Sequence, residues 1–500
     1  MSDNMTKSFS EKGYDVLIYL SDQHTADCAG FMGDAIVRTP NLDRIAKDSF
    51  VFHNAYTSCP LCVPARASFL TSRMPSNIGV FDNSCDFKSS EVTFAHTHAL
   101  KGYDCTLIGR MHFVGLDYFH GFTNRIGKDM TPSYWGCPSE ERKDLGDFGR
   151  SLYQKHCLEV VGGGDSPVLS YDREIVDHAL SFYDEEHENP QMTVVGTYGP
   201  HFPYVGPEEK MPHYRKIFAE NYADESMFFD LPPVDAKVQN TTKEDIIELR
   251  SAYYAMVETL DEQVGLVYDA YTRYLSRTGR KGIFIYMSDH GDQLGCMGIY
   301  GKQTFFEKSA KIPLVMKVDD FSGRDITEPV SIMDIAPTLC EINGTAEIPL
   351  AEGNSFFQLL AGEPDPSRYV LSEYYDNQIA ECIRGYMVYK GHFKYIMYAG
   401  FEDKELLFDL RKTESERNNV SVRYPEICHD MRNIIETDER IKNHTREFLD
   451  NKKQHKLLDK VGRKQHYLNR YLYSPPEESR FIAASCKRPH RDGWTTIIGV

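Results

Sequence analysis

Four short apolar runs in this sequence each end abruptly in polar residues. The runs cover residues 15–20, 105–108, 192–195 and 282–287. Near-continuous apolar runs of this length are typical of strands buried on both faces, as in a parallel sheet covered by helices. We therefore predict an α/β fold built on a large, mostly parallel sheet that is flanked by helices.

The segments that follow these four runs carry side chains that bind metals or transfer protons. In open α/β sheets, sites form beyond the carboxyl ends of the strands. A single site is therefore expected to gather side chains from all four strand ends, with these candidates: Asp22, Gln23, Arg110, His112, His201, Asp289 and His290.

Helical patterns fill the segments between the predicted strands. One helix is expected to start at Thr39-Pro40. A longer one follows Thr242, which forms a start resembling a capping box with Asp245. Between residues 246 and 267, apolar side chains recur at spacings of three and four and make one apolar stripe. We expect this helix to pack on the sheet.

The sequence changes character at residues 362–366, a Gly- and Pro-containing stretch typical of a linker. Beyond it lie β-rich runs at 369–375, 382–389, 392–398 and 406–410, and Lys390-Gly391 has the composition of a hairpin turn. From about residue 424 the pattern is helical. We predict a catalytic domain over residues 1–365 and a smaller C-terminal α+β subdomain with an antiparallel sheet over residues 366–500.

The overall charge of the chain argues against polyanionic partners. Its 500 residues carry a formal net charge of −18. Such a surface repels nucleic acid and anionic membranes, so we expect neither as a partner. A basic run at residues 452–464 is more typical of a solvated helix face than of a binding site.

The first apolar run is too short for a signal peptide or a membrane span, and no later stretch reaches spanning length. The twelve cysteines show no disulfide-like framework. These features predict a cytoplasmic protein with reduced thiols.

The stretch Cys62-Val63-Pro64-Ala65-Arg66 gathers the requirements of an anion site. Pro64 is expected where a helix starts, because its missing N–H is tolerated there. Cys62 then lies at the positive end of that helix, and Arg66, four residues later, returns to the same face. The spacing therefore predicts a site for a tetrahedral oxyanion. A lone cysteine is more often a small buried apolar residue, and the Cys59/Cys62 pair also fits a redox or zinc site.

This stretch resembles the type I sulfatase signature C-x-P-x-R, whose cysteine is oxidised after translation to formylglycine. Residues 288–295 resemble the second signature of that family, and residues 301–307 continue it. The resemblance covers roughly residues 14–120, 190–205 and 280–316. It implies an alkaline-phosphatase-like fold and an enzyme that hydrolyses sulfate esters.

Carboxylate, amide and imidazole groups at the strand ends are ligands for a hard or borderline cation. The resemblance implies a metal ion bound by these residues and by the modified cysteine: Asp22, Gln23, Cys62, Asp289 and His290. The ion of the family is usually Ca²⁺, and an imidazole ligand leaves Mn²⁺ open.

The resemblance also implies the catalytic side chains. Arg66 orients the hydrated aldehyde, and His112 occupies the histidine of the family's G-K-x-H motif, where Arg110 replaces the more usual lysine. His201 and Lys302 match positions that hold the sulfate group and assist the leaving oxygen.

The implied mechanism uses both hydroxyls of the hydrated aldehyde. One hydroxyl, stabilised as an oxyanion by the metal and Arg66, attacks sulfur. His201 or another nearby donor protonates the leaving alcohol. The second hydroxyl, deprotonated by His112, then expels sulfate and restores the aldehyde, a step that an unmodified thiolate cannot perform.

The sequence of residues 75–83 and 111–115 is most similar to that of choline-sulfatase-like members of the family. A quaternary ammonium group needs an aromatic cage, and Trp135 and Trp494 are candidates for its side chains. A sulfated sugar or an aryl sulfate remains equally open. Glu373 reaches the substrate from the second domain or is a carboxylate on the surface of the second sheet, and the second role is favoured.

The sequence leaves two other functions open. The first is a phosphonate monoester or phosphodiester hydrolase of the same superfamily, and the second is a catalytically silent, metal-stabilised binding protein. The sulfatase reading implies two partners, a small sulfate ester as substrate and a maturation enzyme that acts on Cys62. A homo-oligomer is also compatible with the sequence.

Overall fold

The structure is a computed structural model, and it describes residues 13–131, 143–222, 237–238, 241–377, 382–411, 415–465, 472–480 and 495–496. Trp135 and Trp494, the two candidates for an aromatic cage, lie outside the described residues.

The centre of the molecule is an eight-stranded sheet whose strands follow the order β12-β2-β11-β10-β1-β7-β4-β5. The five strands from β10 to β5 are parallel, whereas β11 runs antiparallel to both β10 and β2. This arrangement confirms the prediction of a large, mostly parallel sheet. The bounds are β1 (Asp15–Asp22), β2 (Phe50–Phe52), β4 (Asp104–Gly109), β5 (Asn124–Ile126), β7 (Gln191–Pro200), β10 (Gly282–Ser288), β11 (Leu314–Val318) and β12 (Asp325–Ile326).

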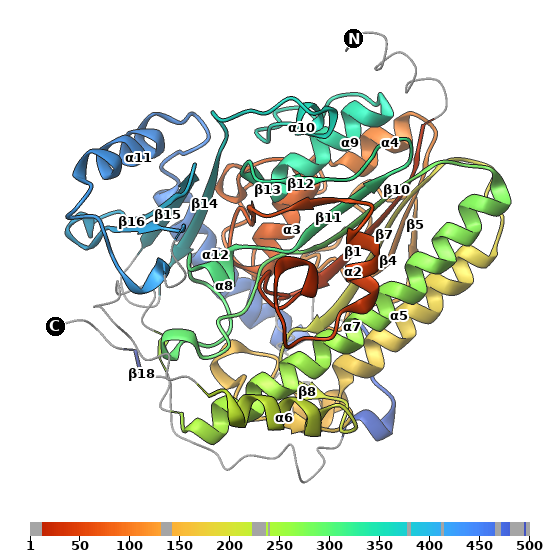
Figure 1. Cartoon of the computed structure of the whole chain (residues 1–500), viewed down its shortest axis with the longest axis horizontal. Coiled ribbons are helices and arrows are strands. Elements are labelled where there is room, and N and C mark those ends of the chain that lie inside the picture. Colours follow the sequence, from red (N-terminus) through yellow and green to blue (C-terminus); the bar gives the residue numbers. More distant parts are fainter. Residues whose placement is uncertain are drawn as a thin grey trace.

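Helices cover both faces of this sheet (Figure 1). Because successive side chains of a strand point to opposite faces, β1 contributes Val16 and Ile18 to one core and Leu17 and Tyr19 to the other. The first core includes residues of α3 (Cys62–Thr71), α4 (Phe94–Leu100) and α9 (Ile335–Asn343). The second includes residues of α2 (Pro40–Ala46), α5 (Pro167–Asp184) and α7 (Lys243–Thr278). Burial on both faces explains why the strands read as nearly uninterrupted apolar runs.

The longest helix, α7, begins as its sequence predicts. The side chain of Thr242 accepts a hydrogen bond from the N–H of Asp245, and Asp245 accepts one from the N–H of Thr242. The helix ends at Thr278 and is capped by Gly279, whose φ of 66° is the left-handed conformation that glycine adopts without strain. The apolar stripe packs on the sheet, as expected.

Helix α3 begins at Cys62, two residues before Pro64, the expected start. The first four N–H groups of a helix have no partner within the helix, so Pro64 costs no hydrogen bond at its observed position. The earlier start places Cys62 itself in the first helical position.

A second, four-stranded antiparallel sheet follows the linker. Its strands are β14 (Tyr369–Asp376), β15 (Ile383–Lys390), β16 (Phe393–Tyr398) and β17 (Leu406–Asp409), followed by α11 (Pro425–Thr437) and α12 (Thr445–Gln465). Figure 1 shows β14 to β16 and α11 together on one side of the large sheet. The antiparallel sheet is confirmed, whereas the division of the chain at residue 365 stays a prediction.

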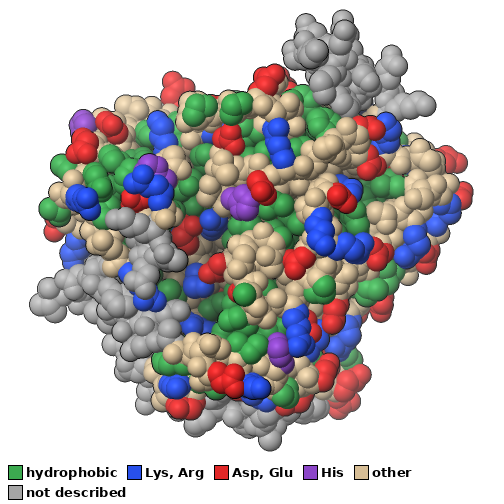
Figure 2. Space-filling model, in the orientation of Figure 1, with side chains coloured by type: hydrophobic (Ala, Val, Ile, Leu, Met, Phe, Trp, Pro, Cys, Tyr) green, Lys and Arg blue, Asp and Glu red, His purple; other side chains and the backbone are tan. Residues whose placement is uncertain are grey.

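Shorter elements complete the described chain: β3 (Ala55–Tyr56), β6 (Val161–Gly163), β8 (Tyr204–Gly206), β9 (Lys237–Val238), α6 (Met211–Glu220), α8 (Glu307–Ala310), β13 (Val330–Ser331), α10 (Phe357–Ala361) and β18 (Thr495–Thr496). None of the helices in the described part of the chain is long and apolar enough to cross a bilayer. On the face in Figure 2, acidic and basic side chains are interspersed.

Candidate active site

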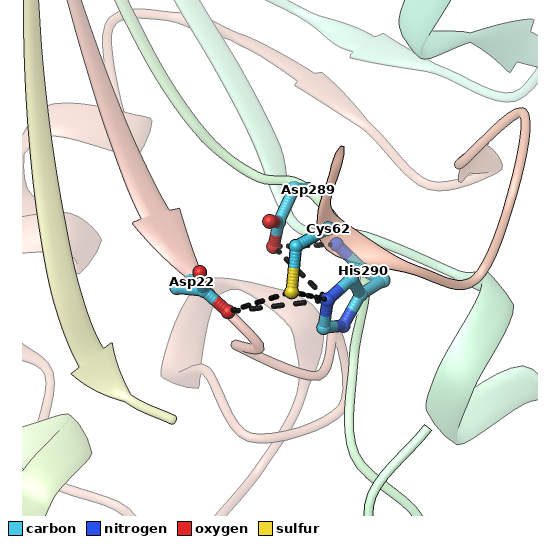
Figure 3. Close-up of side chains that lie close together, drawn as sticks. All are labelled: Asp22, Cys62, Asp289 and His290. Carbon is cyan, nitrogen blue, oxygen red and sulfur yellow. Dashed lines mark hydrogen bonds and ion pairs between the residues drawn. The ribbon is translucent and has the colours of Figure 1, made fainter. Parts of the chain in front are cut away.

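Three elements bring four metal-binding side chains to one point (Figure 3). Asp22 ends β1, Asp289 and His290 follow β10, and Cys62 starts α3. The Cys62 Sγ atom lies 3.2 Å from Nε2 of His290 and 3.7 Å from Oδ1 of Asp22. Nε2 of His290 lies 3.9 Å from Oδ1 of Asp22 and 3.7 Å from Oδ1 of Asp289. All four residues are buried, and their ligand atoms can share one metal ion.

Two buried guanidinium groups hold the outer oxygens of the carboxylates. Arg66 donates from Nε to Oδ2 of Asp289 at 2.7 Å and from Nη2 to Oδ2 of Asp22 at 3.1 Å. Arg110 donates from Nε to the same Asp22 oxygen at 2.8 Å. Burial by itself raises the pKa of Asp22, but the charges of Arg110, Arg66 and Lys302 together hold it well below its usual value. The Oδ1 atom of Asp22 therefore faces the cluster on an ionised carboxylate.

Lys302 places a charge directly beside the sulfur atom. Its Nζ atom lies 3.0 Å from Cys62 Sγ and 4.0 Å from Oδ1 of Asp22. Burial and the Asp22 charge nevertheless raise the pKa of the Cys62 thiol to about 11. Because the thiolate is the nucleophile, the unmodified side chain is poorly reactive near neutral pH.

Gln23 contacts both the metal-binding cluster and the residues around it. Its backbone N–H donates to Oδ1 of Asp289 at 3.1 Å, and its amide nitrogen donates to Oδ2 of Asp292. The amide oxygen accepts a hydrogen bond of 2.8 Å from Lys302. Gln23 is therefore in the site, and its predicted contact with a metal ion stays a prediction.

Arg110 also determines which nitrogen of His112 carries the proton. Its Nη2 atom donates to Nδ1 of His112 at 2.8 Å. A guanidinium group has no acceptor, so Nδ1 accepts and the proton of neutral His112 lies on Nε2. Burial and the neighbouring charge of Arg110 lower the pKa of His112 well below its ordinary value. His112 therefore presents an N–H donor at Nε2.

His201, which follows β7, has the opposite tautomer. Its Nδ1 atom lies 2.6 Å from the carbonyl oxygen of Phe202, which can only accept. The proton of neutral His201 is therefore on Nδ1, and its lone pair is on Nε2. Burial and Lys302 lower the pKa of His201 well below its usual value.

A sulfatase family model matches residues 15–345, and a model of the C-terminal region of N-sulphoglucosamine sulphohydrolase matches residues 295–441. The chain belongs to the sulfatase family. These enzymes hydrolyse sulfuric esters. The first match includes every predicted catalytic and metal-binding residue.

Two curated sulfatases illustrate this relationship. A choline-sulfatase of Rhizobium meliloti (strain 1021) is 33% identical over 414 residues, which cover 77% of this chain and 78% of the relative. Arylsulfatase K of Danio rerio is 26% identical and covers 84% of this chain and 82% of its own length.

A solved structure shares the fold. The phosphonate monoester hydrolase of Agrobacterium radiobacter matches with a TM-score of 0.66, 21% identity and coverage of 88% of this chain and 96% of its own. At this identity the likeness shows the fold alone.

Sequence reasoning assigned no role to two carboxylates that organise this sulfatase site. Oδ1 of Asp129 accepts from Arg110 at 2.9 Å, and its Oδ2 accepts from the N–H of His112 at 2.9 Å. Asp292 accepts from Gln23, from Tyr204 and from the N–H of Gly301, next to Lys302. Asp292 lies within the second signature, so the sequence could have indicated its role. Asp129 follows β5, a strand of three residues that is too short to be recognised from the sequence.

Glu373 is buried, so the expectation of a carboxylate on the sheet surface is wrong. Both of its carboxylate oxygens accept hydrogen bonds from Ser76, one from the backbone N–H at 2.8 Å and one from the hydroxyl at 3.0 Å. Burial raises the pKa of Glu373 to about 7.

Proposed function

We propose that this sulfatase hydrolyses a small sulfate ester to an alcohol and sulfate, with Cys62 converted to formylglycine by a maturation enzyme. The observation that supports this proposal most strongly is the meeting of Cys62, Asp22, Asp289 and His290 within 4.8 Å of one another. An unmodified thiol with a pKa of about 11 is a poor nucleophile there. The hydrated aldehyde of formylglycine supplies a hydroxyl nucleophile instead.

The donor set fits a divalent cation. Asp22, Asp289 and His290, with the modified Cys62 and Gln23, would hold Ca²⁺, and the imidazole also suits Mn²⁺. Such an ion supplies Lewis-acid polarisation of a sulfate oxygen and lowers the pKa of a neighbouring hydroxyl.

The surrounding cations act on the negative charge of the reacting group. Lys302 is placed to neutralise charge on the sulfate oxygens, and Arg66 orients the modified side chain of residue 62. His201 carries its proton on Nδ1, which donates to Phe202. It can protonate a leaving alcohol from Nε2 only after taking up a second proton.

The role of His112 depends on Arg110. With Nδ1 engaged, His112 donates from Nε2, where a sulfate oxygen is a suitable acceptor. The base role that the family resemblance implies requires Nδ1 to be released by Arg110.

The substrate class and the cellular context are part of the same proposal. The relative named choline-sulfatase makes a compact alkyl sulfate the first substrate to test. None of the ten cysteines in the described residues forms a disulfide, which supports a cytoplasmic location. We retain the division at residue 365 and a homo-oligomer as proposals.

The test combines maturation with a substrate panel. The protein is coexpressed with a maturation enzyme, and mass spectrometry of the peptide that contains residue 62 should show the mass loss of formylglycine. Rates are then compared on choline sulfate, nitrophenyl sulfate and a phenyl phosphonate ester. Faster turnover of a sulfate supports the proposal, and preference for the phosphonate supports the alternative hydrolase. An unmodified Cys62 under these conditions, with no turnover, indicates a silent binding protein.

A further inference from the structure

A second group of metal-binding side chains lies outside the active site. It joins the loop at residues 82–85 to α12, far along the chain. Asp82, Cys85 and His455 each offer a ligand atom within 4.8 Å of the others. Cys85 is buried, whereas Asp82 and His455 are partly exposed. We propose that these three residues, with Asn451, bind a structural Zn²⁺ ion.

The kinds of donor atoms favour zinc. Cysteine sulfur, histidine nitrogen and carboxylate oxygen are its usual protein ligands. Asn451 and His455 are four residues apart on α12, so their side chains share one face of the helix.

The two sulfur-to-oxygen distances match those of a tetrahedral site. Cys85 Sγ lies 3.6 Å from Oδ1 of Asp82 and 3.4 Å from Oδ1 of Asn451. Zinc bonds of about 2.3 Å to sulfur and about 2.0 Å to oxygen place tetrahedral S and O ligands about 3.5 Å apart.

The hydrogen bonds around Cys85 leave a place for a cation. Oδ1 of Asp82 and Oδ1 of Asn451 both lie beside the Cys85 thiol. The thiol has a single proton, so it can donate a hydrogen bond to only one of these two oxygens. The backbone N–H of Phe81 also donates to the sulfur atom at 3.3 Å. Oδ1 of Asp82 also accepts from the N–H of Ser84 at 2.9 Å. A cation between the sulfur atom and the two oxygens would hold all three as ligands. Binding replaces the S–H bond with a Zn–S bond and releases one proton to solvent.

The outer contacts orient the ligands. The hydroxyl of Ser84 lies 2.6 Å from Oδ1 of Asp82 and 3.1 Å from Nδ1 of His455. Lys452 forms an ion pair with Oδ2 of Asp82, which leaves Oδ1 directed at the cluster. Hydrogen-bonded outer groups of this kind fix the geometry of metal ligands.

This site would connect α12 to α3, the helix that begins at Cys62. In the same loop, Oδ1 of Asn83 accepts a hydrogen bond of 3.0 Å from the N–H of Val63, the residue after Cys62. A zinc ion on Asp82, Cys85 and His455 would therefore fix the loop that contacts the start of α3.

The test uses Co²⁺, which reports thiolate ligation through charge-transfer absorption, in a Cys62→Ser/Asp289→Asn background that disables the active-site group. We expect this background to show the absorption and to bind about one equivalent of Zn²⁺ per chain in competition. Adding Cys85→Ser should remove the absorption, and adding His455→Gln should weaken binding at least tenfold. Cys428→Ser and His429→Gln, on the neighbouring α11, are the matched controls and should change neither.

A second measurement covers the event that Cys85→Ser does not fold. Zn²⁺ should slow hydrogen exchange of residues 445–465 in the wild-type chain and leave it unchanged in His455→Gln. Absence of the cobalt absorption in the folded background protein, or its persistence in folded Cys85→Ser, would overturn the proposal.

Discussion

At the scale of single residues, the site is organised by cations that fix the anionic groups around them. Arg66 and Arg110 engage the outer oxygens of Asp22 and Asp289, and Lys302 contacts the sulfur of Cys62. Each charge is buried and paired, so the loss of one partner leaves the others uncompensated. Substitutions of these cations are therefore expected to affect catalysis directly.

Lys302→Gln should lower kcat by about 10²- to 10³-fold, because it removes a donor aimed at the reacting group. Steady-state kinetics on the matured enzyme measure this effect. Lys311→Gln, in the following segment, is the control and should keep kcat within about twofold, since its partly exposed pair with Glu307 contributes little. Equal losses in both variants would contradict the assignment.

Arg110→Gln should move the ionisation of His112 to higher pH. Burial and the charge of Arg110 both disfavour protonated His112, so removing that charge raises the pKa of the imidazole. If catalysis needs neutral His112, the acidic limb of the kcat/KM profile shifts upward in pH.

Arg110→Lys keeps the charge and is the control for this prediction. It cannot bond Asp22, Asp129 and His112 together as the guanidinium does. We expect a lower rate with a smaller shift of the acidic limb. An acidic limb at the same pH in the wild type and in Arg110→Gln would contradict the proposed effect of Arg110 on the pKa of His112.

At the scale of secondary-structure elements, an ion cluster around the buried Lys394 joins the second sheet to helix α8. Lys394 of β16 donates to Glu307 of α8 at 2.9 Å and to Glu416 at 2.8 Å. Tyr56 of β3 donates to Glu307 at 3.0 Å. The Lys302 segment leads into α8, and Phe305 and Phe306 pack in the core beneath the second sheet. The second sheet therefore supports the segment that carries Lys302.

Lys394→Met should destabilise the protein by about 3–5 kcal/mol, because it removes the buried cation that Glu307 and Glu416 share and leaves Glu307 only its partly exposed pair with Lys311. Thermal or urea unfolding measures the loss. The triple variant Lys394→Met/Glu307→Gln/Glu416→Gln removes the uncompensated charges and should recover much of the stability. A Lys394→Met protein as stable as the wild type would show that the cluster does not contribute to stability.

At the scale of the whole molecule, two buried carboxyl groups link stability to pH. Burial raises the pKa of Asp172 and of Glu373 to about 7 in each case. Folding therefore favours their protonated forms, and the stabilisation is complete below the unfolded pKa values near 4. It is lost as the pH rises through about 7.

The wild-type Tm should accordingly fall between pH 5 and pH 8, with about 3 kcal/mol of stability at stake for each group. Glu373→Gln keeps the hydrogen-bonding shape without the charge, so its Tm should fall less over this range. Thermal scans at both pH values test this expectation. The exposed substitution Glu363→Gln is the control, and identical pH dependence of Glu373→Gln and wild type would contradict the prediction.

The sequence by itself was enough to predict the large parallel sheet, the antiparallel sheet, the long helix after Thr242 and the family. These features rest on local patterns: apolar runs, a capping box and contiguous signatures around Cys62 and Asp289. The same patterns placed Asp22, His112 and His201 at strand ends, where an α/β sheet forms its site.

Only the tertiary structure decided how these side chains act on one another. The tautomers of His112 and His201 depend on Arg110 and on a backbone carbonyl, and the roles of Asp129 and Asp292 depend on contacts across the sheet. Cys85 and His455 meet although hundreds of residues separate them. Such pairings follow from the packing of distant segments, which no local sequence pattern records.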